Sequence, residues 1–398
     1  MPLTPCKTAP EINAYVHLAY GFGAQKWQKA WKNGTKIGLN EEFPYGYHHA
    51  AAFGAQVSFS TDHAENGLQK YLRYAFRLLC GFDLVHAWRN RHNVRRADIV
   101  WTHTESQSLA VLCIMRLLNA AKRPKIIAQS VWLYDEWQHF SGLKRAFYRK
   151  LLRAADILSV HSPLNRDVAA RLFPAQRVEL VKFGIKADFA PLPKSSPAGR
   201  PVRVLSLGND RHRDWETLIE ATRNQPTIEV KLATASLKTA PDSRNISIVR
   251  APTNDALFAL FAWADLAVVP LKPNLHASGI TVILEAVTLG LPVICSRAGG
   301  LEAYFGPEEV VYVPGQDPGQ LRTAILRLAQ DDTYRHGLIH NARRRLYNDE
   351  LTSAGYARRH VELSRQLLGL PAARDTTQPP ARAAATALPQ PPQGINVY

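Results

Sequence analysis

Short apolar runs alternate along the chain with segments in which apolar residues recur every three or four positions. This alternation is typical of parallel α/β proteins, whose strands are buried on both faces and whose helices cover the sheet. In the first half, helical periodicity appears, for example, over residues 68–80 and 143–155. The apolar runs that predict strands there are residues 14–20, 56–60, 99–102, 126–129, 157–160 and 178–182.

The alternation restarts after residues 191–201, a proline- and serine-rich segment that predicts an interdomain linker. The later strands are expected at residues 202–207, 229–234, 246–249, 266–269, 292–295 and 310–313, and the helices at 215–222, 254–263, 281–289 and 320–330. Two Rossmann-like α/β domains are therefore predicted, over residues 1–190 and 202–350. Open parallel sheets bind ligands at the carboxyl ends of their strands, so we expect the two domains to face each other across a cleft.

The end of the chain differs from the rest. Residues 351–370 have helical periodicity and predict a C-terminal helix. Residues 371–398 are rich in proline, alanine, glutamine and threonine and lack apolar periodicity, so we expect them to be disordered.

Composition narrows the class of protein. A chain of 398 residues is long enough for two domains, each with its own core. Its four cysteines are scattered, which favours free thiols in a reducing compartment over disulfides or a zinc site. No apolar run reaches about 18 residues, and residues 1–10 lack a signal-peptide pattern, so we expect a cytoplasmic protein.

The formal net charge of +16 has three interpretations. The surface is simply basic, or it lies against anionic lipid, or it binds nucleic acid. The sequence has no recognition-helix, zinc-finger or aromatic RNA-binding pattern, so no nucleic-acid partner is expected. Residues 144–153 mix cations with apolar residues as an interfacial helix does, although an ordinary packed helix fits equally. Residues 89–96 are also strongly basic.

The segment over residues 270–305 carries the clearest candidate chemistry. Ser278 and Gly279 precede an apolar helix that begins near Ile280, and the free amides of a helix start bind phosphate well. Thr281 and Glu285 are four residues apart on one helix face, from which the carboxylate could reach ligand hydroxyls. The alternative is that Ser278 only caps the helix and Glu285 is an ordinary exposed charge.

A second candidate follows the strand at 202–207. Gly208 permits a tight turn, and Arg211 and Arg213 could clamp a diphosphate and stabilise it as a leaving group. The alternative is two solvated arginines, with Asp214 as a helix cap. In either case, this loop lies at the carboxyl end of a predicted strand.

The N-terminal half offers weaker candidates. Gly21 and Gly23 would allow the backbone to approach a sugar or acceptor, although such glycines are often only tight turns. His103 follows a predicted strand and suits proton transfer, with a buried structural role as the alternative. His48 and His49 could touch the acceptor, but a structural role is the alternative for them as well. There is no D-x-D motif and no P-loop, so neither a metal site nor an ATPase is expected.

Together, residues 205–221 and 278–302 and the segment Phe183–Phe189 resemble the retaining family-4 glycosyltransferases, or glycosyl transferases group 1. The resemblance covers roughly residues 95–365 and implies the GT-B fold. It also implies that the N-terminal domain binds the acceptor and the C-terminal domain binds a nucleotide-sugar donor.

The resemblance assigns roles to individual residues. Glu285 matches the second Glu of the family's E-x(7)-E motif, which binds the donor ribose, and Ala277 stands at the first. Arg213 matches the basic donor-phosphate residue, and Arg211 substitutes for a second one, whose place holds Asn209. The usual histidine falls near Ser130, for which His103 could compensate. The residues of the diphosphate loop are Ser278, Gly279, Ile280 and Thr281.

These assignments predict a retaining hexosyltransferase in which His103, Arg213 and Glu285 are the catalytic residues. It would move a hexose from a UDP- or GDP-sugar to a glycan or lipid-linked acceptor, without a cofactor, in bacterial polysaccharide assembly. The expected location is cytoplasmic and peripheral to the inner face of the plasma membrane. A non-catalytic nucleotide-sugar-binding or scaffold protein is the alternative, followed by a nucleotide-sugar epimerase and a nucleic-acid-binding protein.

Overall fold

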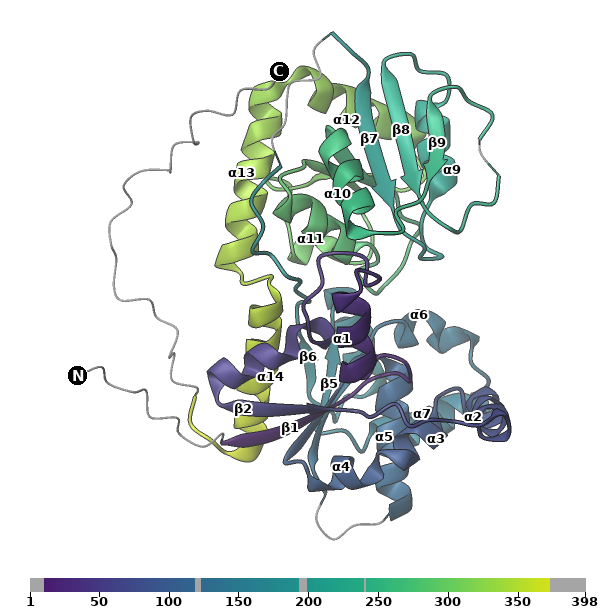
Figure 1. Cartoon of the computed structure of the whole chain (residues 1–398), viewed down its shortest axis with the longest axis vertical. Coiled ribbons are helices and arrows are strands. Elements are labelled where there is room, and N and C mark those ends of the chain that lie inside the picture. Colours follow the sequence, from purple (N-terminus) through teal and green to yellow (C-terminus); the bar gives the residue numbers. More distant parts are fainter. Residues whose placement is uncertain (1–10, 119–122, 193–198, 240, 373–398) are drawn as a thin grey trace, which may run out of the picture.

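The computed structural model describes residues 11–118, 123–192, 199–239 and 241–372. The chain forms two α/β domains, one above the other in Figure 1. Each domain is built on a six-stranded sheet in which all the paired strands are parallel. The predicted fold class is therefore confirmed.

The N-terminal sheet has the strand order β2-β1-β3-β4-β5-β6. Its strands are β1 (Ile12–His17), β2 (Ala55–Phe59), β3 (Ile99–Thr102), β4 (Lys125–Ser130), β5 (Ile157–Val160) and β6 (Val178–Leu180). Its helices are α1 (Ala24–Lys32), η1 (Pro44–Phe53), α2 (Gly67–Cys80), α3 (Leu84–Arg89), α4 (Arg91–Arg96), α5 (Glu105–Leu118), α6 (Leu133–Glu136), η2 (Trp137–His139), α7 (Gly142–Leu152) and α8 (Pro163–Leu172).

The C-terminal sheet has the order β12-β11-β10-β7-β8-β9, so its first strand also lies inside the sheet. Its strands are β7 (Val202–Leu207), β8 (Ile228–Ala233), β9 (Ile246–Val249), β10 (Leu266–Val269), β11 (Val293–Ser296) and β12 (Val311–Val313). The helices that follow are α9 (Trp215–Thr222), α10 (Asn254–Trp263), α11 (Ile280–Thr288), η3 (Leu301–Ala303), α12 (Pro318–Gln330) and α13 (Asp332–Asn348).

Every strand expected from the sequence is present, within a few residues of its expected ends. Between β1 and β2 the apolar periodicity does not predict α1 or η1, which the structure contains. In η1 the backbone of Tyr45 and Gly46 has positive φ, which interrupts the helical repeat. The predicted linker and tail lie largely outside the described residues, and the domain limits remain predictions.

The last helix, α14 (Ser353–Leu368), returns from the C-terminal domain and packs on η1 and β4 of the N-terminal domain. The indole N–H of Trp101 on β3 donates to the hydroxyl of Ser364 at 2.9 Å. The hydroxyl of Tyr356 donates to the side-chain oxygen of Gln129 on β4, also at 2.9 Å. The C-terminal helix thus completes the core of the N-terminal domain.

Two expectations about composition can be compared with the structure. Three cysteines within the described residues, Cys80, Cys113 and Cys295, are free thiols. Among the helices of the described part of the chain, none combines the length and apolar character needed to cross a lipid bilayer.

Candidate functional site

The carboxyl ends of β7 and β10 and the start of α11 meet around Arg213. The guanidinium is buried, with 5% of the residue exposed. It donates from Nε to the carbonyl of Leu207 at 3.0 Å and from Nη1 to the hydroxyl of Ser278 at 3.4 Å. Arg213 is therefore fixed at the edge of the sheet, and the interpretation of a solvated side chain does not apply to it.

Two glycines make room for this arginine. A Cβ at Gly208 would lie 2.4 Å from the Nε of Arg213, and one at Gly279 would lie 2.9 Å from its Nη1. Gly279 also caps α11 with a φ of 85°, a conformation that residues with a side chain rarely adopt. The structure thus brings together four residues that the sequence selects as donor-binding candidates, namely Gly208, Arg213, Ser278 and Gly279.

Asp210 lies at the centre of the same site, although the sequence analysis did not select it. Its Oδ2 accepts from the hydroxyl of Ser278 at 2.9 Å and lies 3.3 Å from Nε2 of His276. Its Oδ1 accepts from the backbone N–H of His212 at 2.8 Å. Burial raises the pKa of Asp210, but the hydrogen bonds from His276, His212 and Ser278 outweigh burial and hold this pKa well below its usual value. Asp210 is therefore a carboxylate.

His276 joins the two domains. Its Nδ1 lies 3.1 Å from a carboxylate oxygen of Asp135 on α6, whose other oxygen accepts from the backbone N–H of Leu275 at 2.7 Å. Burial lowers the pKa of His276, but hydrogen bonds to Asp135 and Asp210 outweigh burial and raise it overall. A protonated His276 can donate to a carboxylate of each domain at once, so this bridge holds α6 against the loop before α11.

The neighbouring Arg211 points away from the predicted diphosphate position. Its guanidinium pairs with Glu136 of α6, and more than half of its side chain is exposed. Asn209 serves the C-terminal domain itself, because its side-chain oxygen accepts from the backbone N–H of Ala235 at 2.6 Å. These contacts leave the predicted donor-phosphate role of both residues as a prediction.

Glu285 is buried beneath a loop of the N-terminal domain. Its Oε1 accepts from the backbone N–H of Leu39 at 3.1 Å, and a Cβ on Gly38 would lie 2.8 Å from the same oxygen. Asn254 at the start of α10 holds this loop, accepting from the N–H of Gly38 at 2.9 Å and donating to the carbonyl of Lys36 at 3.3 Å. Burial raises the pKa of Glu285 to about 7, against the opposite effect of the Leu39 N–H.

Three further positions of the diphosphate segment differ in exposure. Thr281 is exposed at the first turn of α11, whereas Ile280 is buried. Ala277 is buried with a positive φ of 53°, and its N–H donates to the carbonyl of Gly299 at 3.1 Å. The position of the family's first Glu therefore carries only a methyl group, packed closely against the following strand's loop.

The glycines after β1 have an internal partner. The backbone N–H groups of Gly21 and Gly23 donate to the two carboxylate oxygens of Asp62 at 2.8 and 3.1 Å. A Cβ on Gly23 would lie 2.7 Å from the carbonyl of Ser60. These glycines thus allow a tight turn around Asp62, and their contact with the donor remains a prediction.

His103 lies in a pocket of the N-terminal domain with a volume of about 550 Å³. The imidazole stacks on Tyr45 at 3.5 Å between ring centroids, and its Nδ1 lies 3.2 Å from the hydroxyl of Tyr47. Burial, with nearby His161, His360 and Lys36, lowers the pKa of His103 well below its usual value. His103 is therefore neutral near pH 7. The pocket extends from the carboxyl end of the sheet to α2 and α7.

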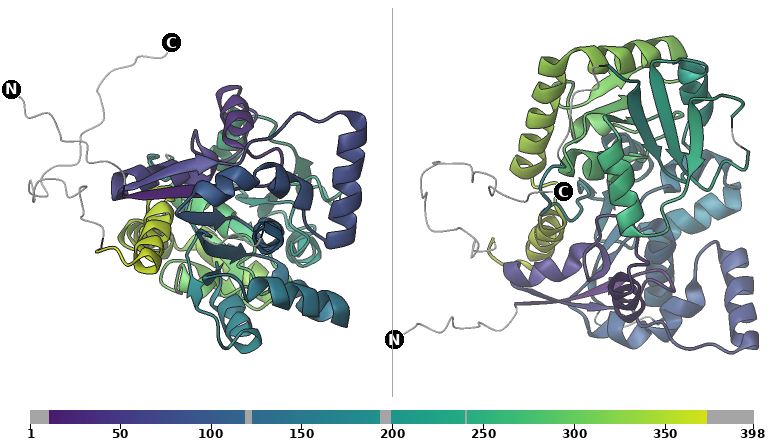
Figure 2. Two further views of the ribbon diagram at one scale, coloured as in Figure 1. Left: turned by 90° about the horizontal axis from the view of Figure 1, so that it is seen from below. Right: turned by 45° about the horizontal axis from the view of Figure 1, so that its top comes forward.

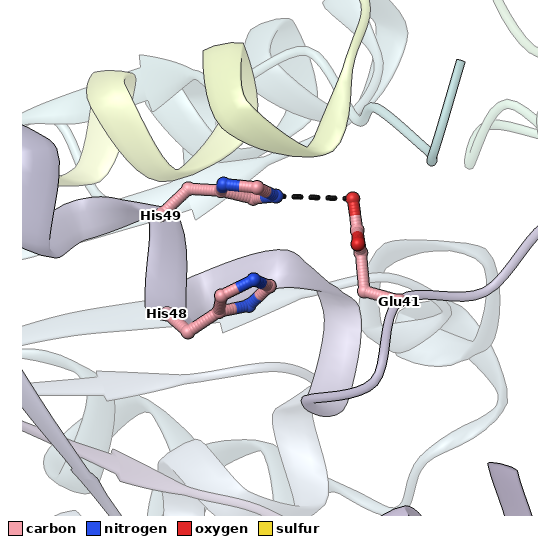
Figure 3. A group of neighbouring side chains, drawn as sticks. All are labelled: Glu41, His48 and His49. Atoms are coloured by element: carbon pink, nitrogen blue, oxygen red, sulfur yellow. Dashed lines mark hydrogen bonds and ion pairs between the residues drawn. The ribbon is translucent and has the colours of Figure 1, made fainter. Parts of the chain in front are cut away.

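Two groups of described residues have side-chain atoms close enough to hold a metal ion, within 4.8 Å of one another: Glu41, His48 and His49, and Asp135, His212 and His276. In the first group, Nε2 of His49 already bonds Oε1 of Glu41 at 3.0 Å (Figure 3). In the second, His276 bonds both Asp135 and Asp210. In each group, therefore, one histidine is already hydrogen-bonded to the carboxylate.

Comparisons with known proteins agree with this architecture. Residues 210–331 match the family model described as glycosyl transferases group 1, whereas no curated protein sequence matches the chain. Sucrose-phosphate synthase from Thermosynechococcus elongatus is similar in structure, with 19% sequence identity and a TM-score of 0.65, covering 90% of this chain and 99% of that chain.

Two other solved structures are similar over nearly the whole chain. HepE from Anabaena, in complex with UDP-glucose, has 13% identity and a TM-score of 0.61, and the match covers 90% of this chain and 100% of that chain. Trehalose-phosphate synthase (UDP-forming) from Burkholderia vietnamiensis has 13% identity and a TM-score of 0.59, with coverage of 89% and 100%. The C-terminal domain therefore matches glycosyl transferases group 1 over residues 210–331, and the whole chain shares the two-domain α/β fold of these solved structures.

Proposed function

We propose that the chain is a retaining hexosyltransferase that uses a UDP- or GDP-sugar. The C-terminal domain binds the donor, and the pocket of the N-terminal domain receives a glycan or lipid-linked acceptor. The proposed setting is bacterial polysaccharide assembly at the inner face of the plasma membrane, and the reaction requires no metal or other cofactor. The UDP-glucose complex of HepE and the UDP-forming trehalose-phosphate synthase support a nucleotide-sugar donor.

The observation that carries this proposal is the position of Arg213 against the first turn of α11. A buried guanidinium between Gly208 and Gly279 provides a fixed positive charge where the helix also presents free amides. A nucleoside diphosphate placed there is stabilised as it leaves the sugar, because charge in a buried site interacts strongly with fixed donors. Glu285, on the same helix, is the proposed partner of the donor ribose.

The proposed mechanism depends on positioning. The donor diphosphate takes the proton of the acceptor hydroxyl on the face from which the diphosphate leaves, so the anomeric configuration is retained without a protein nucleophile. The pair formed by Asp135 and His276 holds the cleft closed and excludes water that would hydrolyse the donor. Neutral His103, stacked on Tyr45, orients the acceptor in the pocket.

Thermal stability with UDP, GDP, ADP and their sugars tests donor binding. A ligand at about 100 times its Kd adds roughly 2.7 kcal/mol, so one nucleotide should raise Tm clearly. We expect Arg213→Ala to remove this increase and to lower turnover by about 10²–10³-fold. Arg297→Ala is the matched control, because Arg297 is an exposed arginine of the same domain, paired with Glu302.

If Arg213→Ala unfolds the domain, Ser278→Ala still tests donor binding, because this substitution removes only one hydroxyl group from the site. Unchanged donor binding in both variants would show that the nucleotide lies elsewhere.

A second candidate function is nucleotide-sugar binding without transfer. The observation that favours it is Ala277, whose buried methyl group stands where the family's carboxylate contacts the transferred sugar. Donor consumption distinguishes the two functions. A protein that binds one nucleotide-sugar tightly, yet neither hydrolyses nor transfers its sugar with any glycan or lipid acceptor, is the binding protein.

A further inference from the structure

Helix α2 turns its charged side inward. Of its fourteen residues, all of them described by the structure, Arg73 alone is buried. The guanidinium donates to the carboxylate of Glu65 at 3.0 Å and to that of Asp83 at 2.8 Å, and it lies 4.2 Å from the ring centre of Tyr20. A buried ion pair, and not an apolar face, therefore attaches α2 to the domain.

The apolar side of the same helix faces solvent. Five of its large residues recur at i, i+3, i+4, i+10 and i+11 from Leu68, which places them on one face, opposite Arg73. Tyr74 and Phe76 lie on either side of this face. The helix stands away from the rest of the N-terminal domain in all three views (Figures 1 and 2). Leu78 is 88% exposed and Leu79 82% exposed. The exposed apolar residues of α2 are Leu68, Tyr71, Leu72, Tyr74, Phe76, Leu78 and Leu79.

Exposed basic side chains accompany this apolar face. Lys70 and Arg77 are exposed on the other side of α2, the side that carries Arg73. Helix α7 lies beside the end of α2, where the hydroxyl of Tyr148 donates to the carbonyl of Cys80 at 3.0 Å. On α7, Leu143 is 85% exposed and Lys150 is exposed as well. An apolar helix face, with exposed cations on the other side of the helix and on the neighbouring α7, fits an anionic interface, whereas a second copy of a chain with net charge +16 would be repelled.

The same two helices border the pocket that contains His103. Arg77 and Gly81 at the end of α2, and Lys144 and Tyr148 of α7, line one side of it. The pocket therefore reaches from the carboxyl end of the sheet to the apolar helix.

We propose that α2 docks the N-terminal domain on an anionic lipid bilayer, with its apolar face among the acyl chains and its cations at the headgroups. The basic residues of α7 flank it at the same surface. This part of the proposal rests on the proposed function: the acceptor is an amphiphilic lipid, and its polar head enters the pocket from the bilayer. The helix enters the interface only partly and leaves the α/β core outside the lipid.

Co-sedimentation of the full chain with vesicles tests the docking. The vesicles contain phosphatidylcholine and phosphatidylglycerol in equal amounts, with pure phosphatidylcholine as the reference. We expect the protein to bind the anionic vesicles more tightly and to detach as salt is raised. The double variant Leu78→Ser with Leu79→Ser should bind them at least about tenfold more weakly. Leu117→Ser, an exposed leucine at the end of α5, should bind as the unchanged protein does.

Two results would overturn the proposal. One is unchanged vesicle binding by the double variant. The other is a dimer of the unchanged protein in sedimentation velocity that the double variant disperses, because α2 would then contact a second copy. Nucleotide binding by the unchanged protein separates this proposal from the proposed function. If that protein binds UDP or GDP but does not bind the anionic vesicles, only the docking is refuted. If it binds the vesicles but no nucleotide, only the donor site is refuted.

Discussion

Helices α11 and α2 differ in how far the rest of the protein covers them, although their two domains have the same kind of sheet. In α11, eight of nine residues are buried and Thr281 alone is exposed, whereas in α2 only Arg73 is buried. Both helices have many apolar residues, so composition does not separate them. The difference is whether other elements cover the helix. The cover of α11 fixes the residues of the proposed donor site, and the lack of cover on α2 leaves exposed the face that we propose to bind lipid.

The cover of α11 comes from both domains. Leu284 packs in the core of the C-terminal domain, while Glu285 accepts from Leu39 of the N-terminal domain. The attachment of α2 is local, through Arg73 to Glu65 and Asp83. A helix held by one buried charge can keep its apolar face exposed, because no element in the described part of the chain covers that face.

The largest expected effect tests this contrast directly. Leu284→Ala removes a fully buried side chain and should lower the free energy of unfolding by about 2–5 kcal/mol. Leu79→Ala, on the exposed face of α2, should change it by less than about 0.5 kcal/mol. Denaturant unfolding of the two variants measures both values. If Leu79→Ala lowered the free energy of unfolding nearly as much as Leu284→Ala, this face of α2 would have to be packed against the protein in solution.

The next effect concerns the charge that α11 buries. The pKa of the Glu285 carboxyl is raised by burial from 4.5 to about 7. Below 4.5 the folded and unfolded states are both protonated, so this group costs nothing. As the pH rises from 4.5 to 7, the unfolded chain ionises first, and stability falls by about 3 kcal/mol in all. Above 7 the loss is complete.

Glu285→Gln removes this pH dependence. The stability of the variant should equal that of the unchanged protein at about pH 4 and exceed it at about pH 8, because the amide oxygen can still accept from the N–H of Leu39. Its donor binding should weaken, since the proposed bond to the ribose loses its charge. Equal stability of the two proteins at both pH values would show that Glu285 is solvated in solution.

The smallest effect concerns the loop over α11. Asn254→Ala removes two hydrogen bonds to residues 36–38 and should loosen the loop by about 1 kcal/mol. Faster hydrogen exchange of the Gly38 and Leu39 amides would report this loosening. Asn341→Ala, which removes two surface hydrogen bonds of an α13 side chain, is the matched control. If exchange at Leu39 does not change, Asn254 does not hold the loop.

Much of the donor-side geometry could be predicted from short segments. Gly208, Arg213, Ser278 and Gly279 follow two strands whose carboxyl ends share one edge of the sheet, so alternation alone brings them close. Asp210 and His276 lie in the same two segments, so the candidate residues beside them in the sequence could have indicated that they belong to the site. Asp135 offered none, because it reaches the site from the other domain across 141 residues of sequence.

Local periodicity and glycine placement thus determined the two sheets, their helices and the space around Arg213, because these depend on residues that are neighbours along the chain or on adjacent strands. The tertiary structure alone decided which helix faces are covered. Leu39 meets Glu285 across 246 residues, and Arg73 turns α2 outward through a buried ion pair. An amphipathic pattern specifies that one face of a helix is apolar. Whether that face lies in a core or in solvent depends on contacts between residues that are far apart in the sequence.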